Sequence, residues 1–287
     1  MSTPRVSPPR IFPEAAPAGK PPAGSAGSAD AYRQTGFVLG AEVEMAVEGL
    51  NIEGAIAQGS SGAKQRTQQM ASALGLWSRA WLCRLEALHA VQWGNYTAAI
   101  PLIRSAADCQ AAGLWLLQTD AAEWVEWLAQ GGMALAAEEH AMEYQLHAFR
   151  SAEVLAGHEI LGPVYRTATD LSLPHFGTTL LLAGSDSTPE RVLMTFADRD
   201  FHLGLAELVL GWLHQLAAAQ VEACLAYEGV FGIPDPAGAQ AFATRSRAAA
   251  ATPSRCRVEV VEREGMTRYL VQNWRRAPGA APKRVLL

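Results

Sequence analysis

Apolar residues recur every three to four positions along most of the chain, which predicts a mostly α-helical protein. Residues 30–57 show this spacing, and Asp30 stands where a helix N-cap is expected. Residues 63–92 follow a short Gly-Ser loop and are predicted to form a long helix with an apolar stripe. That stripe consists of Leu74, Trp77, Trp81, Leu85, Leu88 and Val91.

Further helices are predicted from about Asn95 to Gln130, over 133–157 and over 200–227. Gly94-Asn95 has the residue types that end one helix and begin the next. Thr119-Asp120 is a candidate break, and Gly157 is a candidate helix end. The core of the bundle is expected to include Trp77, Trp81, Leu85, Leu88, Trp115 and Leu208.

The C-terminal region has a different pattern. Residues 257–261 and 267–271 alternate polar and apolar positions around Gly265, which predicts a β-hairpin. One face would carry Val258, Val260, Tyr269 and Val271. Two strands alone are marginally stable, so the hairpin must pack on the bundle or pair with another chain.

These patterns divide the chain into four segments. Residues 1–29 are rich in Pro, Ala and Gly and are expected to form a disordered tail. Residues 30–232 form the helical bundle, 233–254 an Ala-rich linker, and 255–287 the basic hairpin segment. The fold class is therefore a helical bundle with a C-terminal β-hairpin and a disordered N-terminal tail.

Charge is spread unevenly over these segments. The chain has a net charge of −5, yet residues 243–287 sum to +7 and the tail to +2, which leaves −14 on the rest. A basic segment beside an acidic body favours docking within one chain or between two chains, or contact with RNA. Both docking alternatives stay open, and the symmetric one predicts a homo-oligomer.

The chain shows no sign of secretion or of a membrane span. Cys83, Cys109, Cys224 and Cys256 form no C-x-x-C pair, and the N-terminus has no apolar signal region. The apolar stretch 203–227 is interrupted by charged and amide residues, which is typical of a buried helix. We therefore expect a cytoplasmic protein that does not contact membranes.

Two segments carry a family resemblance. Residues 98–108 read Ala-Ala-Ile-Pro-Leu-Ile-Arg-Ser-Ala-Ala-Asp, and residues 164–176 run from Val-Tyr-Arg-Thr to Pro-His-Phe. They resemble a group of uncharacterised bacterial all-helical proteins that is distantly similar to the HEPN superfamily. In that group an Arg-Ser-x-x-Glu helix precedes a Tyr-x-x-x-Ser…His segment; here Asp108 replaces the Glu, and Thr169 stands near the Ser position.

The resemblance covers roughly residues 35–230 and implies an all-helical bundle. It points to Arg104, Asp108, Tyr165 and His175 as one polar network. Many HEPN-like domains are RNases in phage defence, and many others are inactive. Membership would therefore only hint at an activity.

The active HEPN signature places Arg four to six residues before His, and Arg84…His89 matches it. The chain is rich enough in Arg for such a match to arise by chance. Five helical steps also place the two side chains roughly 140° apart. The catalytic candidates are Arg84, His89, Arg104 and His175, and they would serve a metal-independent RNase.

A metal site has weaker support. Glu86 and His89 form one Glu-x-x-His pair, and His140, Glu143 and His147 share a helix face. A di-iron bundle needs two such pairs and two further glutamates. We expect a solvated polar face, no metal and no cofactor.

Two functions remain open. The absence of a strong catalytic motif favours a non-catalytic interaction or scaffold protein that self-associates, with its tail or hairpin contacting partners. Ile11 and Phe12 are the only adjacent large apolar residues of the tail and could form a short docking motif. The alternative is a HEPN-like RNase or toxin-type protein of phage defence.

Overall fold

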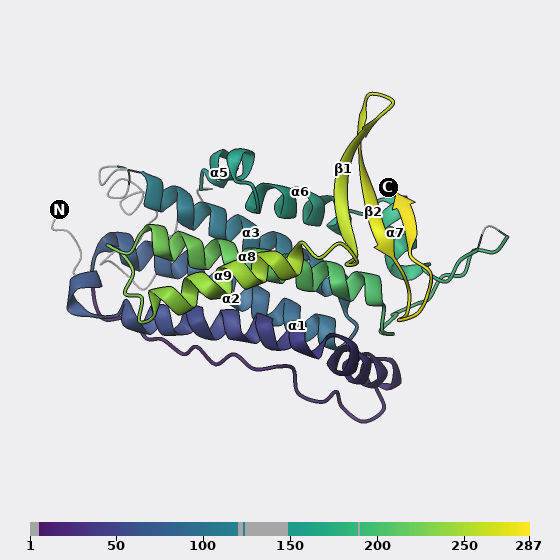
Figure 1. Ribbon diagram of the computed structural model, residues 1–287, viewed down its shortest axis with the longest axis horizontal. Coiled ribbons are helices and arrows are strands. Elements are labelled where there is room, and N and C mark those ends of the chain that lie inside the picture. The colour runs from purple at the N-terminus through teal and green to yellow at the C-terminus, as the bar shows by residue number, and fades with distance from the viewer. Residues whose placement is uncertain (1–5, 120–122, 124–148, 189) are drawn as a thin grey trace, which may run out of the picture.

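A computed structural model describes residues 6–119, 123, 149–188 and 190–287, and within these ranges the protein is mostly α-helical (Figure 1). The long helices are α1 (Ala26–Gly59), α2 (Gln68–Gln92), α3 (Tyr96–Gln118), α8 (Leu203–Ala226) and α9 (Pro236–Ala250). Shorter helices are α5 (Ser151–Gly157), α6 (Leu161–Ser172) and α7 (Phe176–Ala183), and a 3-10 turn spans Ala63–Gln65. The sheet contains β1 (Arg257–Arg263), β2 (Met266–Trp274) and β3 (Lys283–Leu286).

Helix α8 occupies the centre of the bundle. It packs against α1, α2, α3, α6 and α9, and most of its residues are buried. Within the described part of the chain, it is the one helix long and apolar enough to cross a membrane, and 72% of its most apolar window is buried inside the protein. That burial is typical of the core helix of a bundle, as the sequence predicted.

Local signals define several helix ends. Thr67 Oγ1 accepts the Met70 N–H at the start of α2, and Asp235 accepts the Gly238 N–H at the start of α9. Gly94 ends α2 with a φ of +69°, and a Cβ there would lie 2.1 Å from the Arg199 carbonyl oxygen. The predicted Gly94-Asn95 turn is therefore confirmed, and glycine is required at its first position.

The boundaries of the first two helices differ from the prediction. Helix α1 begins at Ala26, so Asp30 is not its N-cap; instead it accepts hydrogen bonds from Arg33 and Gln34. Helix α2 begins at Gln68 rather than at residue 63. The break at Thr119 and the end at Gly157 are confirmed, whereas most of the predicted helix 133–157 lies outside the described residues.

The tail also differs in part from the prediction. Residues 26–29 belong to α1, and residues 6–25 lie in a mainly extended path along the bundle (Figure 1). The Ala18 N–H donates to Gln92 Oε1 at 2.7 Å, and Trp93 Nε1 donates to the Gly19 carbonyl at 2.9 Å. The composition of this segment disfavours helix and strand, but it does not prevent docking on neighbouring helices.

The predicted linker 233–254 is wrong, because most of it is helix α9. Ala239, Phe242 and Ala243 are buried against α8 and its neighbours. Alanine has the highest helix propensity, and these apolar positions recur at helical spacing. The prolines that suggested a linker lie at the ends of the helix rather than inside it.

The C-terminal hairpin is confirmed and gains a third strand. Glu264 and Gly265 form its turn, both with positive φ, and Val258 pairs with Val271 and Val260 with Tyr269 as expected. The antiparallel order is β1-β2-β3. Strand β3 was not predicted, because Lys-Arg-Val-Leu is too short to show alternation.

Four of the six expected core residues are buried: Trp77, Leu85, Leu88 and Leu208. Trp81 and Trp115 are only half-buried. Trp81 lines a cavity under the tail, and the Trp115 ring lies under the guanidinium of Arg150. Aromatic residues at the edge of a bundle keep helical spacing without full burial, so spacing alone could not separate these two from the core.

Leu85→Ala should lower the free energy of unfolding by about 2–5 kcal/mol, because the side chain is buried between packed helices. Leu82→Ala, on the same helix but half exposed, should cost less than about 0.5 kcal/mol. Urea unfolding followed by circular dichroism measures both. Equal losses for the two variants would contradict the assigned core face of α2.

Candidate interaction site

A buried ion pair lies between α1 and α2. Arg84 donates from Nη1 to Glu53 Oε1 at 2.6 Å and also pairs through Nη2, and Trp77 Nε1 donates to Glu53 Oε2 at 2.7 Å. The two charged side chains are 1% and 0% exposed. The carboxylate thus has three donors, which offsets the cost of burying its charge.

This geometry removes Arg84 from the catalytic candidates. Its guanidinium is enclosed within the bundle, whereas His89 Nε2 lies 2.9 Å from the tail carbonyl of Ala16. The two side chains therefore serve different neighbours, as their helical phase suggested. Glu53 was not among the predicted site residues, although its spacing from Leu50 and Ile56 places it on the buried face of α1.

The network expected from the family resemblance is only partly formed. Arg104 Nη2 donates to the Tyr165 hydroxyl at 3.2 Å, and this hydrogen bond raises the pKa of Arg104. Asp108 accepts instead from Ser151 Oγ at 2.6 Å. His175 is exposed at the start of α7, and the described hydrogen bonds do not join it to the other three.

The described residues contain no group of three or more His, Cys, Asp or Glu able to hold a metal ion. Glu86 is exposed on α2, and His89 faces the tail. His140, Glu143 and His147 lie outside the described residues.

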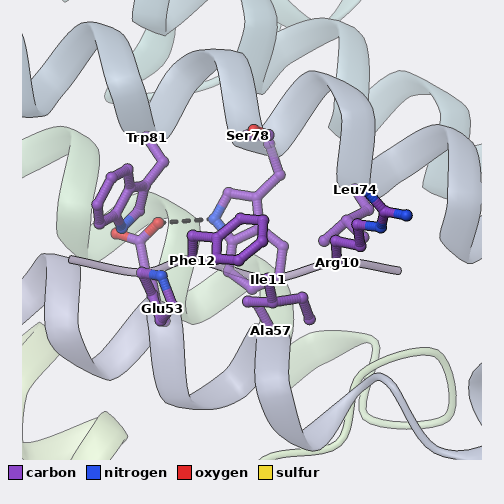
Figure 2. Close-up of a pocket in the computed structure, with 11 residues that line it drawn as sticks. Arg10, Ile11, Phe12, Glu53, Ala57, Leu74, Ser78 and Trp81 are labelled. Carbon is purple, nitrogen blue, oxygen red and sulfur yellow. Dashed lines mark hydrogen bonds between the residues drawn. The ribbon is translucent and has the colours of Figure 1, made fainter. Parts of the chain in front are cut away.

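The tail crosses a groove between α1 and α2 (Figure 2). Arg10 to Pro13 line a cavity of about 110 Å³ together with Glu53 and Ala57 of α1 and with Leu74, Trp77 and Trp81 of α2. Ile11 and Phe12, the expected docking residues, therefore lie on their own bundle. Phe12 remains 78% exposed.

The basic C-terminal segment docks on the acidic body of the same chain. Arg275 pairs with Glu207 at 2.8 Å, and Arg276 lies between Asp186, Asp198 and Asp200 at 3.5–3.9 Å. The Tyr269 hydroxyl donates to Asp170, and burial followed by this contact raises the pKa of Tyr269 to about 12. The charge asymmetry thus acts within the chain, one of the two arrangements expected.

Two buried histidines connect α8 to its neighbours, His202 to the C-terminal sheet and His214 to α1. His202 Nδ1 accepts a hydrogen bond from the Leu205 N–H at 3.3 Å, and the centroid of its ring lies 4.3 Å from the centroid of the Trp274 ring. Burial and then the charge of Arg276 lower the pKa of His202 to about 3. His214 Nε2 donates to the Glu42 carbonyl at 3.0 Å, and burial lowers the pKa of His214 to about 4.

An apolar arm projects between α7 and α8 (Figure 1). Residues 184–188 and 190–200 form its described part, and Val192 is 71% exposed, Met194 50% and Phe196 100%. Its base is fixed, because the Thr195 N–H donates to the Ala183 carbonyl at 2.7 Å. Phe176 on the adjoining helix α7 is also 82% exposed. Several large apolar side chains exposed near one another in this way are typical of an interaction site.

Comparisons of the chain with family models, with curated proteins and with solved structures find no match. The resemblance to the HEPN superfamily therefore stays a prediction.

Arg84→Met should lower the free energy of unfolding by about 3–5 kcal/mol, because it leaves the Glu53 carboxylate buried without its cation. The double variant Glu53→Gln/Arg84→Met should lose less than the single variant. The exposed pair of Arg245 and Glu48 supplies a control, since Arg245→Met should cost about 0–1 kcal/mol. A double variant less stable than Arg84→Met would argue against the buried charge as the cause.

The stability of the fold should fall in mild acid. The unfolded chain binds protons on His202 and His214 below about pH 6.5, whereas the folded chain does so only near pH 3 and 4. The stability that the two neutral histidines contribute is therefore fully present above about pH 6.5. The free energy of unfolding then falls as the pH drops toward 4, by up to about 1.4 kcal/mol per pH unit for each histidine.

His202→Asn isolates one of these titrations, because Asn can cap a helix but does not ionise. Urea unfolding between about pH 7 and pH 4.5 should show a smaller loss of stability for this variant than for the parent chain. Equal pH slopes would rule out His202 as a contributor.

Proposed function

We propose that this protein is a non-catalytic helical interaction protein that self-associates through one end of its bundle. The apolar arm between α7 and α8 is the observation that carries the proposal. Phe196 and Val192 expose most of their surface there, and Phe176 on the adjoining helix α7 is also exposed. Burying apolar surface is favourable by about 25 cal/mol per Å², so such an arm favours association.

The arm is held by hydrogen bonds. Leu193 N donates to Ser187 Oγ at 3.0 Å, and Thr188 and Arg191 pair as an isolated bridge. A segment that is already ordered loses little further entropy when it binds. Its apolar side chains are therefore displayed in a fixed arrangement that suits a defined partner surface.

Helix α7 connects the arm to the C-terminal sheet. A Cβ at Gly184 would lie 3.0 Å from the Met194 sulfur, and one at Gly177 would lie 3.3 Å from Leu287. The arm, α7 and the end of the sheet thus form neighbouring surfaces. A second copy of the chain that presents the same end would bury both arms in a two-fold interface.

The polar residues support this proposal over the RNase alternative. Arg84 is bonded to Glu53, and Arg104 to Tyr165, while His175 is exposed at the start of α7. General acid–base cleavage of RNA needs its groups within hydrogen-bonding reach of one substrate. The two Arg candidates are instead directed at partners within the bundle.

The triple variant Val192→Ser/Met194→Ser/Phe196→Ser tests the proposal by multi-angle light scattering of the full chain. The parent chain should have the mass of a dimer or larger assembly, and the variant should dissociate at the same concentration because its arm no longer presents apolar surface. Leu82→Ser removes an exposed leucine from α2 and should leave the mass unchanged. A monomeric parent chain would refute self-association.

A further inference from the structure

The groove that holds the tail is shaped to fit it. Pro13 packs on Gly54 of α1, and a Cβ at Gly54 would lie 2.5 Å from the Pro13 Cβ; its three nearest atoms all belong to Pro13. Glycine inside a helix costs about 1 kcal/mol relative to alanine. At this position, the space that glycine leaves is occupied by Pro13 of the tail.

The two tryptophans that line the groove offer it no free N–H group. Trp77 Nε1 donates to Glu53, and Trp81 Nε1 donates to the Leu50 carbonyl at 3.0 Å, so both indole N–H groups are satisfied within the bundle. Arg84 neutralises the charge of Glu53 inside the bundle. The exposed part of the groove therefore favours apolar and proline side chains, as aromatic grooves that recognise proline-containing peptides do.

The tail is held unevenly along its length. Residues 16–19 are fixed by hydrogen bonds to Gln92, His89 and Trp93. Among the described contacts, residues 10–13 make no hydrogen bond to α1 or α2; Ile11 and Pro13 are half-buried, and a cavity remains beneath them (Figure 2). Packing alone holds this end, which can leave the groove while residues 16–19 stay bound.

We infer that the groove between α1 and α2 is a peptide-binding site and that residues 10–13 are its displaceable intramolecular ligand. The ligand class is a short extended peptide with an apolar pair followed by proline, the chemistry of Ile11-Phe12-Pro13. While the tail is seated, a peptide from outside must compete with it. Its apparent affinity then equals the affinity of an open groove multiplied by the fraction of molecules whose groove is open.

This site is separate from the apolar arm, and its test does not depend on self-association. The probe is a fluorescein-labelled synthetic peptide with the sequence of residues 6–19, and fluorescence anisotropy measures its binding to the full chain. Ile11→Ala/Pro13→Ala weakens the seated tail and leaves the groove intact, so it should bind the peptide about tenfold or more tightly than the parent chain. Pro8→Ala/Pro17→Ala changes two exposed tail positions and should bind like the parent chain.

A second pair of variants examines the groove itself. Gly54→Ala, added to Ile11→Ala/Pro13→Ala, fills the position where Pro13 seats and should weaken peptide binding about tenfold or more. Gly40→Ala, on the same helix with no atom within 4 Å of the added Cβ, should leave binding unchanged. Thermal unfolding confirms that each variant is folded. The inference is overturned if the peptide binds none of the variants, if it binds the parent chain and Ile11→Ala/Pro13→Ala equally, or if Gly54→Ala has no effect.

Discussion

Helix α8 is buried on nearly every side, and that constraint determines how the rest of the chain is arranged. A helix that is mostly apolar and exposes so little surface must be covered all round by other elements. Helices α1, α2, α3 and α9 supply most of that cover, and the C-terminal sheet packs near its N-terminal end. The alanine-rich segment after α8 therefore folds back as α9, and the basic C-terminus folds back as a sheet.

The few polar side chains of α8 determine where the covering elements dock. Glu222 pairs with Arg247 of α9, and Glu207 accepts hydrogen bonds from Arg275 and from the Cys256 N–H next to β1. His214 donates to a carbonyl of α1. Apolar burial supplies the driving force for packing but little directional information, whereas each of these bonds fits one partner in one position. The acidic and basic halves of the charge pattern are thus used to position neighbours within the chain.

The periodic parts of the sequence were sufficient to predict α2, α8 and the hairpin register, because each depends on spacing between near neighbours. Helix α9 was missed because its prolines were interpreted without regard to position, although proline at a helix start favours the helix. Glu53 and Arg84 were missed as a pair because 31 residues separate them and nothing in the sequence states that their two helices meet. Long-range partners of this kind require the fold.

The distribution of polar contacts also bears on function. In the described part of the chain, both Arg residues that were catalytic candidates form hydrogen bonds within the bundle, Arg84 with Glu53 and Arg104 with Tyr165. Large apolar side chains, by contrast, are left exposed on the arm around Phe196 and at Phe176 of α7, and apolar residues line the groove under the tail. A site that lowers a chemical barrier needs polar groups held toward a substrate, whereas recognition of another polypeptide needs apolar surface on a rigid support. The contrast between bonded arginines and exposed apolar side chains is therefore the physical basis of our proposal that this protein acts by binding.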